Sequence, residues 1–126
     1  DFRPDFTAAE SGLDVFINWN KDFIGKEASL VEKKQGIKKK LVTMTIDTKD
    51  IDVTNDEAIL KDNKCVGYIT SGGYAHHVKK SMALGYVPEK FSKHETILNV
   101  EINGKLYSAH VTDRPLYDSN GEKMRI

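Results

Sequence analysis

The sequence is poor in the residues and patterns that define several classes of protein. Its 126 residues include one cysteine, Cys65, which excludes an intrachain disulfide framework and a cysteine-based zinc site. Basic and acidic residues each number 19, so the positive excess typical of nucleic-acid-binding proteins is missing. No apolar run approaches the roughly 20 residues that a membrane-spanning helix needs. We therefore expect one soluble globular domain in a reducing intracellular setting, which binds neither nucleic acid nor membrane.

Six segments after residue 40 have the composition of β-strands. Each is apolar or rich in β-branched residues and is bounded by turn residues. The expected strands are 41–46, 57–60, 64–70, 81–87, 96–102 and 105–111. Asn103-Gly104 joins the last two, and both residues tolerate the positive φ of a type I′ turn, so these strands are expected to pair antiparallel. A polar turn at 61–63 predicts a second hairpin.

The segment before residue 37 predicts a helix and one more strand. Residues 26–35 are good helix formers, with an acidic residue in the first turn, lysines in the last turn and Gly36 placed to end the helix. Apolar residues alternate at positions 13, 15, 17 and 19, which suits a half-buried strand. The elements together predict a mainly β protein, a small antiparallel β-barrel of Greek-key type or a sandwich, with one N-terminal α-helix.

No group of side chains has the spacing of a catalytic or metal site. His76 and His77 are adjacent, and adjacent strand residues point to opposite faces, so the pair cannot bind one metal ion in regular geometry. Gly72-Gly73 lacks the ending of a phosphate-binding loop and is expected to form a bulge or a tight bend. Cys65 is expected to pack as a small apolar residue. We predict no catalytic residue and no metal ligand in this chain.

One dense basic run extends from Lys33 to Lys40. Two interpretations stay open. The lysines form a solvated helix end and strand start, or they attract an anionic ligand or an acidic partner. The second interpretation would make the chain a stand-alone β-barrel interaction module that docks an acidic partner through Lys33–Lys40.

Several segments resemble, in the same order, the C-terminal region of the folate-dependent aminomethyltransferase family. This family includes the T-protein of the glycine cleavage system and the transferase parts of dimethylglycine and sarcosine dehydrogenases. The most specific match is Val-Gly-Tyr-Ile-Thr-Ser-Gly-Gly-Tyr at 66–74. The residues at 22–25 and 68–74 are most similar to the dehydrogenase branch. The full set of matching segments is 10–13, 21–28, 38–42, 66–74, 80–88 and 114–118.

The resemblance implies that the chain is one part of a longer enzyme. Family members have a folate-binding N-terminal part, which holds the aspartate that assists one-carbon transfer, and a C-terminal antiparallel barrel. Residues 1–24 are then expected to be the end of the folate-binding domain and a connector, and 25–126 the C-terminal β-barrel domain. The missing initiator methionine agrees with this expectation. The partner of the barrel would be the N-terminal folate-binding domain of the same polypeptide.

The resemblance also implies a cofactor, tetrahydrofolate, and two residues near it. Lys21 stands where the T-protein has a basic residue that contacts folate, and a lysine can pair with a folate carboxylate. Tyr117 lies in the C-terminal tail, where the T-protein has a tyrosine near the cofactor. A phenol at that place can stack on the pteridine ring or donate a hydrogen bond. The structural alternatives are that Lys21 lies at a surface turn and that Tyr117 packs against the barrel.

The implied reaction moves a one-carbon unit from a small amine, such as dimethylglycine, sarcosine or a glycine-derived group, to tetrahydrofolate. The isolated domain is expected to be inactive. One departure concerns residues 38–40, where lysines replace arginines of the family and do not reproduce the two-pronged carboxylate contact of a guanidinium group. The implied location is the cytoplasm, or the mitochondrial matrix in a eukaryote.

Overall fold

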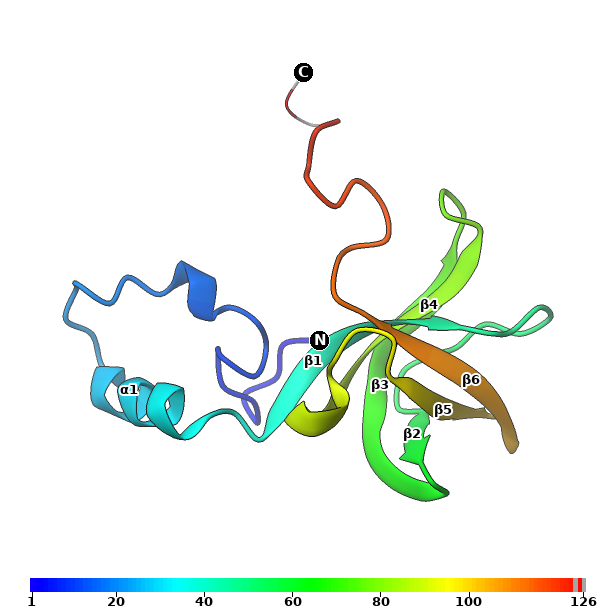
Figure 1. The fold of residues 1–126 in the computed structure, drawn as a ribbon, viewed down its shortest axis with the longest axis horizontal. Helices are drawn as coiled ribbons and strands as arrows, with labels where there is room; N and C mark the ends of the chain where they lie inside the picture. Colours follow the sequence, from blue (N-terminus) through cyan, green and yellow to red (C-terminus); the bar gives the residue numbers. More distant parts are fainter. Residues whose placement is uncertain (124, 126) are drawn as a thin grey trace.

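The chain folds into a closed six-stranded antiparallel barrel with an N-terminal extension (Figure 1). The computed structural model describes residues 1–123 and 125. The strands are β1 (Lys39–Ile46), β2 (Ala58–Lys61), β3 (Lys64–Ala75), β4 (Lys80–Pro88), β5 (Ile97–Ile102) and β6 (Lys105–Thr112). The helical elements are the 3-10 helices η1 (Asp14–Phe16) and η2 (Glu89–Phe91) and the α-helix α1 (Lys26–Gln35).

The strand order around the barrel is β1-β4-β3-β2-β5-β6. Strands β2, β3 and β4 are consecutive antiparallel neighbours. The first strand, β1, pairs with β4, and a longer connection joins β1 to β2. This arrangement is a Greek key. The expected fold class, a mainly β antiparallel barrel with one N-terminal α-helix, is confirmed. None of the described helices combines the length and the apolar character that crossing a membrane requires.

Two tight turns set the register of two hairpins. Asp62 and Asn63 join β2 to β3 with φ values of 50° and 61°, and Asn103 and Gly104 join β5 to β6 with φ values of 49° and 75°. Two consecutive residues with positive φ are the mark of a type I′ turn, whose twist matches that of the paired strands. Both predicted hairpins are therefore confirmed.

The core fills the inside of the barrel and follows the two-residue period of the strands. In β1 every second side chain is buried, and β5 shows the same alternation. Val53, from the connection between β1 and β2, adds a buried side chain to this cluster. The fully buried members of the core include Met44, Ile59, Ile69, Leu98, Val100 and Val111.

The strand predicted at residues 13–19 is wrong. This segment forms turns and the 3-10 helix η1, and the side chains of Val15 and Phe16 are 76% and 81% exposed. The physical reason is topological: β1 pairs with β4 on one side and β6 on the other, so the closed barrel has no free edge to accept another strand. The predicted helix at 26–35 is confirmed, and Gly36 caps its C-terminus with φ 85°.

Two further expectations are corrected by the register of β3. Cys65 is exposed rather than packed, because it occupies the outward position of the strand while the next residue, Val66, packs against the core. Gly72 and Gly73 lie within the regular β3–β4 pairing, and the register shift falls at Thr70 instead. A Cβ at Gly72 would press on Val53, so this glycine is required for close packing rather than for a bulge.

Candidate functional site: the N-terminal strap and its pocket

Residues 1–12, the N-terminal strap, lie along the outside of the barrel against β3 and β4. The ring of Phe6 stacks on the ring of Tyr86, with centroids 3.5 Å apart and planes within 6°. The hydroxyl of Ser11 shares a buried 2.7 Å hydrogen bond with the hydroxyl of Tyr86. Tyr86 is fully buried although it lies outside the core cluster. The strap is thus the layer that covers this tyrosine.

The start of the strap is fixed at the irregular part of β3. The carboxylate of Asp1 accepts hydrogen bonds from the hydroxyls of Thr70 (2.5 Å) and Ser71 (2.8 Å). Two residues later, Arg3 forms a 3.4 Å ion pair with Asp56. These contacts join residues more than 50 positions apart, so no local pattern in the sequence indicates them.

Replacing Phe6 with alanine is expected to loosen the strap by removing its stacking contact with Tyr86. The loss should be about 1–2 kcal/mol in the free energy of unfolding, since a stacked aromatic pair adds to ordinary area burial. Urea unfolding measures the cost, and faster exchange of the Leu41 amide, which donates to the Glu10 carbonyl at 2.8 Å, reports the local effect. Phe16→Ala is the control, because that ring is 81% exposed. Equal losses in the two variants would contradict the role of the stack.

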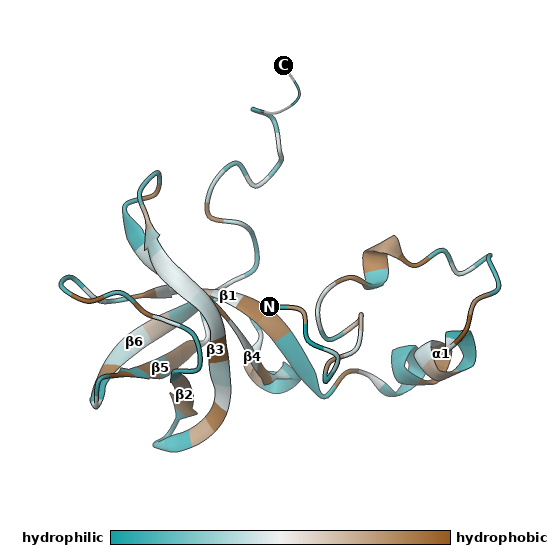
Figure 2. Cartoon of the chain, turned by 180° about the vertical axis from the view of Figure 1, so that it is seen from behind, coloured by the Kyte–Doolittle hydropathy of each residue, from teal (hydrophilic) through white to brown (hydrophobic). Residues whose placement is uncertain are grey.

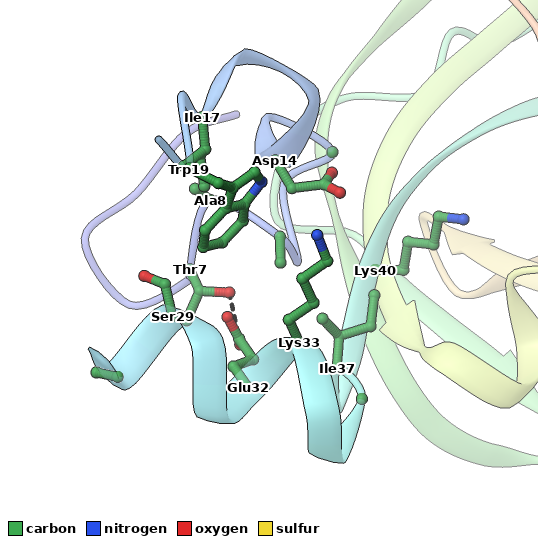
Figure 3. Close-up of a pocket in the computed structure, with 14 residues that line it drawn as sticks. Thr7, Ala8, Asp14, Ile17, Trp19, Ser29, Glu32, Lys33, Ile37 and Lys40 are labelled. Carbon is green, nitrogen blue, oxygen red and sulfur yellow. Dashed lines mark hydrogen bonds between the residues drawn. The ribbon is translucent and has the colours of Figure 1, made fainter. Parts of the chain in front are cut away.

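A pocket of about 460 Å³ lies between the strap, η1 and α1 (Figure 3). The indole of Trp19 projects into it, and the ammonium of Lys33 lies 4.6 Å from the centre of that ring. Glu32, the residue before Lys33 in α1, accepts a 2.8 Å hydrogen bond from the hydroxyl of Thr7. Among the described residues, those that line the pocket include no histidine or cysteine. Its chemistry therefore suits binding through an aromatic plane and charged groups, and it offers no imidazole or thiol for catalysis.

Lys21 lies in the loop between Trp19 and α1. Its backbone N–H donates to the carbonyl of Asn18 at 3.2 Å, which closes a turn, and its side chain is exposed. Within the described residues the ammonium group forms no ion pair or hydrogen bond, and Lys21 does not line the pocket beside Trp19. The group is free to meet an anion that approaches from outside this chain.

Tyr117 lies in the C-terminal tail beside the turn between β3 and β4. Its ring centre is 4.8 Å from that of His77. Lys123 donates a 3.0 Å hydrogen bond to the phenol oxygen and holds its ammonium 4.7 Å from the ring centre. The tail leaves the barrel away from α1 (Figure 1), so this chain alone does not bring Tyr117 to Lys21. The contacts of Tyr117 are therefore to the β3–β4 turn and to the tail itself, and a role beside a cofactor stays a prediction.

Some lysines of the basic run, Lys33–Lys40, already contact aromatic rings within the chain. Besides Lys33 on the Trp19 ring, the ammonium of Lys39 lies 5.4 Å from the ring centre of Phe6. The side chains of residues 38–40 are exposed. Sequence reasoning missed these two cation–aromatic pairs because each joins separate turns of the chain, and only the proximity of lysines to aromatic residues could have hinted at them.

Comparison with known proteins places the barrel in one family. Residues 39–118 match the model of the glycine cleavage T-protein C-terminal barrel domain. The chain is 40% identical over 128 residues to human mitochondrial dimethylglycine dehydrogenase, a match that covers 100% of the chain and 15% of that protein. It is 36% identical to an aminomethyltransferase from a Picosynechococcus species, and this match covers 93% of the chain and 32% of that protein.

The fold agrees with these sequence matches. The crystal structure of the glycine cleavage system aminomethyltransferase T from Bartonella henselae superposes with a TM-score of 0.82 at 24% identity. That superposition covers 92% of this chain and 33% of the other. The chain therefore spans a third or less of the length of these relatives. It belongs to the family of glycine cleavage T-protein C-terminal barrel domains.

Proposed function

We propose that this chain is the C-terminal barrel of a tetrahydrofolate-dependent aminomethyltransferase of the dimethylglycine or sarcosine dehydrogenase type. The observation that carries the proposal is the match to dimethylglycine dehydrogenase, which runs over the whole chain, including residues 1–38 before the barrel. The complete enzyme would move a one-carbon unit from an aminomethyl substrate to tetrahydrofolate and form methylenetetrahydrofolate. Residues 1–24 would be the end of the folate-binding domain and its connector, and the barrel would cover the folate channel.

The residues present suit one end of the folate molecule. The glutamate part of folate carries carboxylates, and the ammonium of Lys21, which forms no ion pair with the described residues, is a point charge that can meet one of them. The phenol of Tyr117 is 45% exposed but already contacts His77 and Lys123, so it is less available for stacking. Bound folate supplies the nitrogen atoms that accept the one-carbon unit. The residues of this chain would orient its anionic end, and the catalytic aspartate would come from the preceding domain.

We expect the 126-residue chain to show no aminomethyl transfer by itself. The pocket beside Trp19 is lined by no imidazole or thiol, and the catalytic aspartate implied by the family resemblance has no counterpart here. The test measures formation of methylenetetrahydrofolate by the isolated chain and by the complete polypeptide encoded by its gene. Turnover by the isolated chain would refute the assignment. An immediate start codon upstream of Asp1 would instead favour the interaction module that binds an acidic partner through Lys33–Lys40.

In the complete polypeptide, Lys21→Ala is expected to weaken tetrahydrofolate binding about tenfold, the typical effect of losing one charge-assisted contact. Lys21→Arg should retain most of the affinity, because it keeps the positive charge. Lys105→Ala, at the exposed start of β6, is the control and should leave binding unchanged. Titration calorimetry with tetrahydrofolate measures all three. Unchanged affinity in Lys21→Ala would remove Lys21 from the site.

We propose a location in the mitochondrial matrix if the chain comes from a eukaryote, and in the cytoplasm otherwise. The support is the mammalian relatives, which are mitochondrial dimethylglycine dehydrogenases. Cell fractionation with an antibody to the barrel tests this location.

A further inference from the structure

Another pocket, of about 360 Å³, lies at the end of the barrel where β1 ends and β4 begins. We call this pocket, lined by residues 45–49, 74 and 79–81, the barrel-end pocket. The strand β1 begins near α1 and runs across the barrel, so the pocket lies on the side away from α1 (Figure 1). The loop after β1 and the start of β4, which flank the pocket, are hydrophilic (Figure 2). Small-molecule sites are often found in the mouths of β-barrels, and they have volumes of this order.

The wall of the barrel-end pocket contains a buried hydroxyl group without a partner. Within residues 1–123 and 125, the hydroxyl oxygen of Ser81 is the buried side-chain atom for which no hydrogen bond is found. Ser81 is 3% exposed and pairs with Ile46, a member of the core, and residues directly opposite in an antiparallel pair share one face of the sheet. A buried hydroxyl without a partner is destabilising, and a ligand that accepts its hydrogen bond would remove that cost.

The charges along the barrel-end pocket favour an anion. Lys49, Lys79 and Lys80 line it, and within the described residues their ammonium groups form no ion pair or hydrogen bond. The carboxylate that lines the pocket, that of Asp47, already lies 3.0 Å from Nε2 of His110. The other acidic residues between β1 and β2 do not line the pocket. Three ammonium groups therefore meet at one hollow with little negative charge to balance them.

The ring of Tyr74 forms the aromatic side of the barrel-end pocket. Tyr74 pairs with Ser81 across β3 and β4, so the two side chains share a face. The tyrosine is 45% exposed, and its ring meets the ring of His76 edge-on with centres 5.0 Å apart. A ring so exposed can turn to admit a ligand to the Ser81 hydroxyl and can then lie against a flat part of that ligand.

We propose that the barrel-end pocket binds a phosphate group, either as the free ion or as part of a small organic phosphate. The inference does not depend on the proposed function. A phosphate group carries about −1.5 to −2 charge at neutral pH and three strong acceptor oxygens, which suit three ammonium groups and the hydroxyl of Ser81. Lysine binds phosphate as a point charge, whereas a planar carboxylate is best matched by a guanidinium group. The described residues that line the pocket include no arginine.

Lysine acetylation in the complete polypeptide tests the site. The rate at each lysine is followed by peptide mass spectrometry in a buffer without phosphate. The added probes are phenyl phosphate, inorganic phosphate, succinate and sodium chloride, compared at equal ionic strength so that screening is the same in every sample. Lys64 and Lys105, exposed residues at the starts of β3 and β6, are the control sites because they lie outside the pocket.

At ten times the dissociation constant of phenyl phosphate, acetylation of Lys79 and Lys80 is expected to slow about tenfold, because about a tenth of the sites stay free. The control lysines should change by less than about twofold. Equal protection by inorganic phosphate supports the free ion as the ligand. Stronger protection by phenyl phosphate supports an organic phosphate whose flat part lies on Tyr74.

Ser81→Ala should raise the phenyl phosphate concentration for half protection about tenfold, the typical effect of losing a hydrogen bond to a charged group. It should not lower the stability of the protein without phosphate, because the hydroxyl has no partner to lose. Ser92→Ala, outside the pocket, is the control and should leave both quantities unchanged. Lys79→Gln, which alters an exposed side chain, should weaken the protection of Lys80 to a similar extent.

Three results would overturn the inference. The first is that no phosphate probe protects the lysines of the pocket, or that the control lysines are protected equally. The second is that succinate protects as well as phosphate does, because the site would then not be selective for phosphate. The third is unchanged protection in both Ser81→Ala and Lys79→Gln, because the phosphate would then bind elsewhere.

Discussion

Gly67→Ala is expected to destabilise the protein by about 3 kcal/mol or more, enough to leave the barrel largely unfolded. A Cβ on Gly67 would overlap the carbonyl oxygen of Tyr86 and would lie 3.0 Å from its carbonyl carbon. Both atoms belong to the backbone of β4, so they cannot move aside as a side chain can. Relief would require β3 and β4 to separate, and this pair makes the largest contact in the barrel.

Urea unfolding followed by circular dichroism measures this effect. Gly36→Ala is the control, because a Cβ there meets no atom within 4 Å, although the φ of 85° is unfavourable for alanine. That variant should cost about 1–3 kcal/mol, because φ 85° with ψ 161° is a backbone region that alanine rarely adopts, and it should unfold at a higher urea concentration than Gly67→Ala. If the two variants unfold at the same urea concentration, steric overlap with β4 is not what requires a glycine at position 67.

Features that depend on neighbouring residues could be predicted from the sequence. The turns at Asp62-Asn63 and Asn103-Gly104 form where the turn residues indicate, since the preference for positive φ belongs to those residues themselves. The helix at 26–35 ends at Gly36 for the same kind of reason. Together with the alternation in β1 and β5, these local signals are sufficient for an antiparallel barrel or sandwich, and the closure of the sheet is seen only in the structure.

Features that depend on distant parts of the chain could not be predicted in this way. The alternation at 13–19 equals that of a strand, yet strand formation also needs a partner edge, and barrel closure removes it. The close approach of Gly67 to Tyr86 is likewise set by how β3 coils across β4. The two-residue period of a strand defines two faces but does not say which of them is buried. Cys65 shows that packing decides this.

The candidate site also contains features that the sequence did not indicate locally. Lys21 and Tyr117 enter through family resemblance, and both stay predictions. The stack of Phe6 on Tyr86 joins residues 80 positions apart, and no sequence period links them. The barrel is hydrogen-bonded to residues 1–12 through Ser11–Tyr86 and Leu41–Glu10. The division of the chain at residue 24 stays a prediction.

Ile59→Ala is expected to cost about 3–4 kcal/mol in the free energy of unfolding, the usual range for truncating a fully buried isoleucine. Ile59 has no exposed surface and lies in β2, a strand of four residues. It pairs with Gly67 of β3 on one side and with Val100 of β5 on the other.

The position of Ile59 makes its loss more damaging than its volume alone suggests. Only two residue pairs, one of them formed by Ile59, join β2 to β5 and close the barrel at this point. Ile97→Ala removes the same atoms from a side chain that is 53% exposed and should cost about 1 kcal/mol or less. Urea unfolding measures both losses, and amide exchange at Leu60 and Asn99 reports barrel opening. Similar losses for the two isoleucines would show that closure through β2 does not depend on the buried side chain.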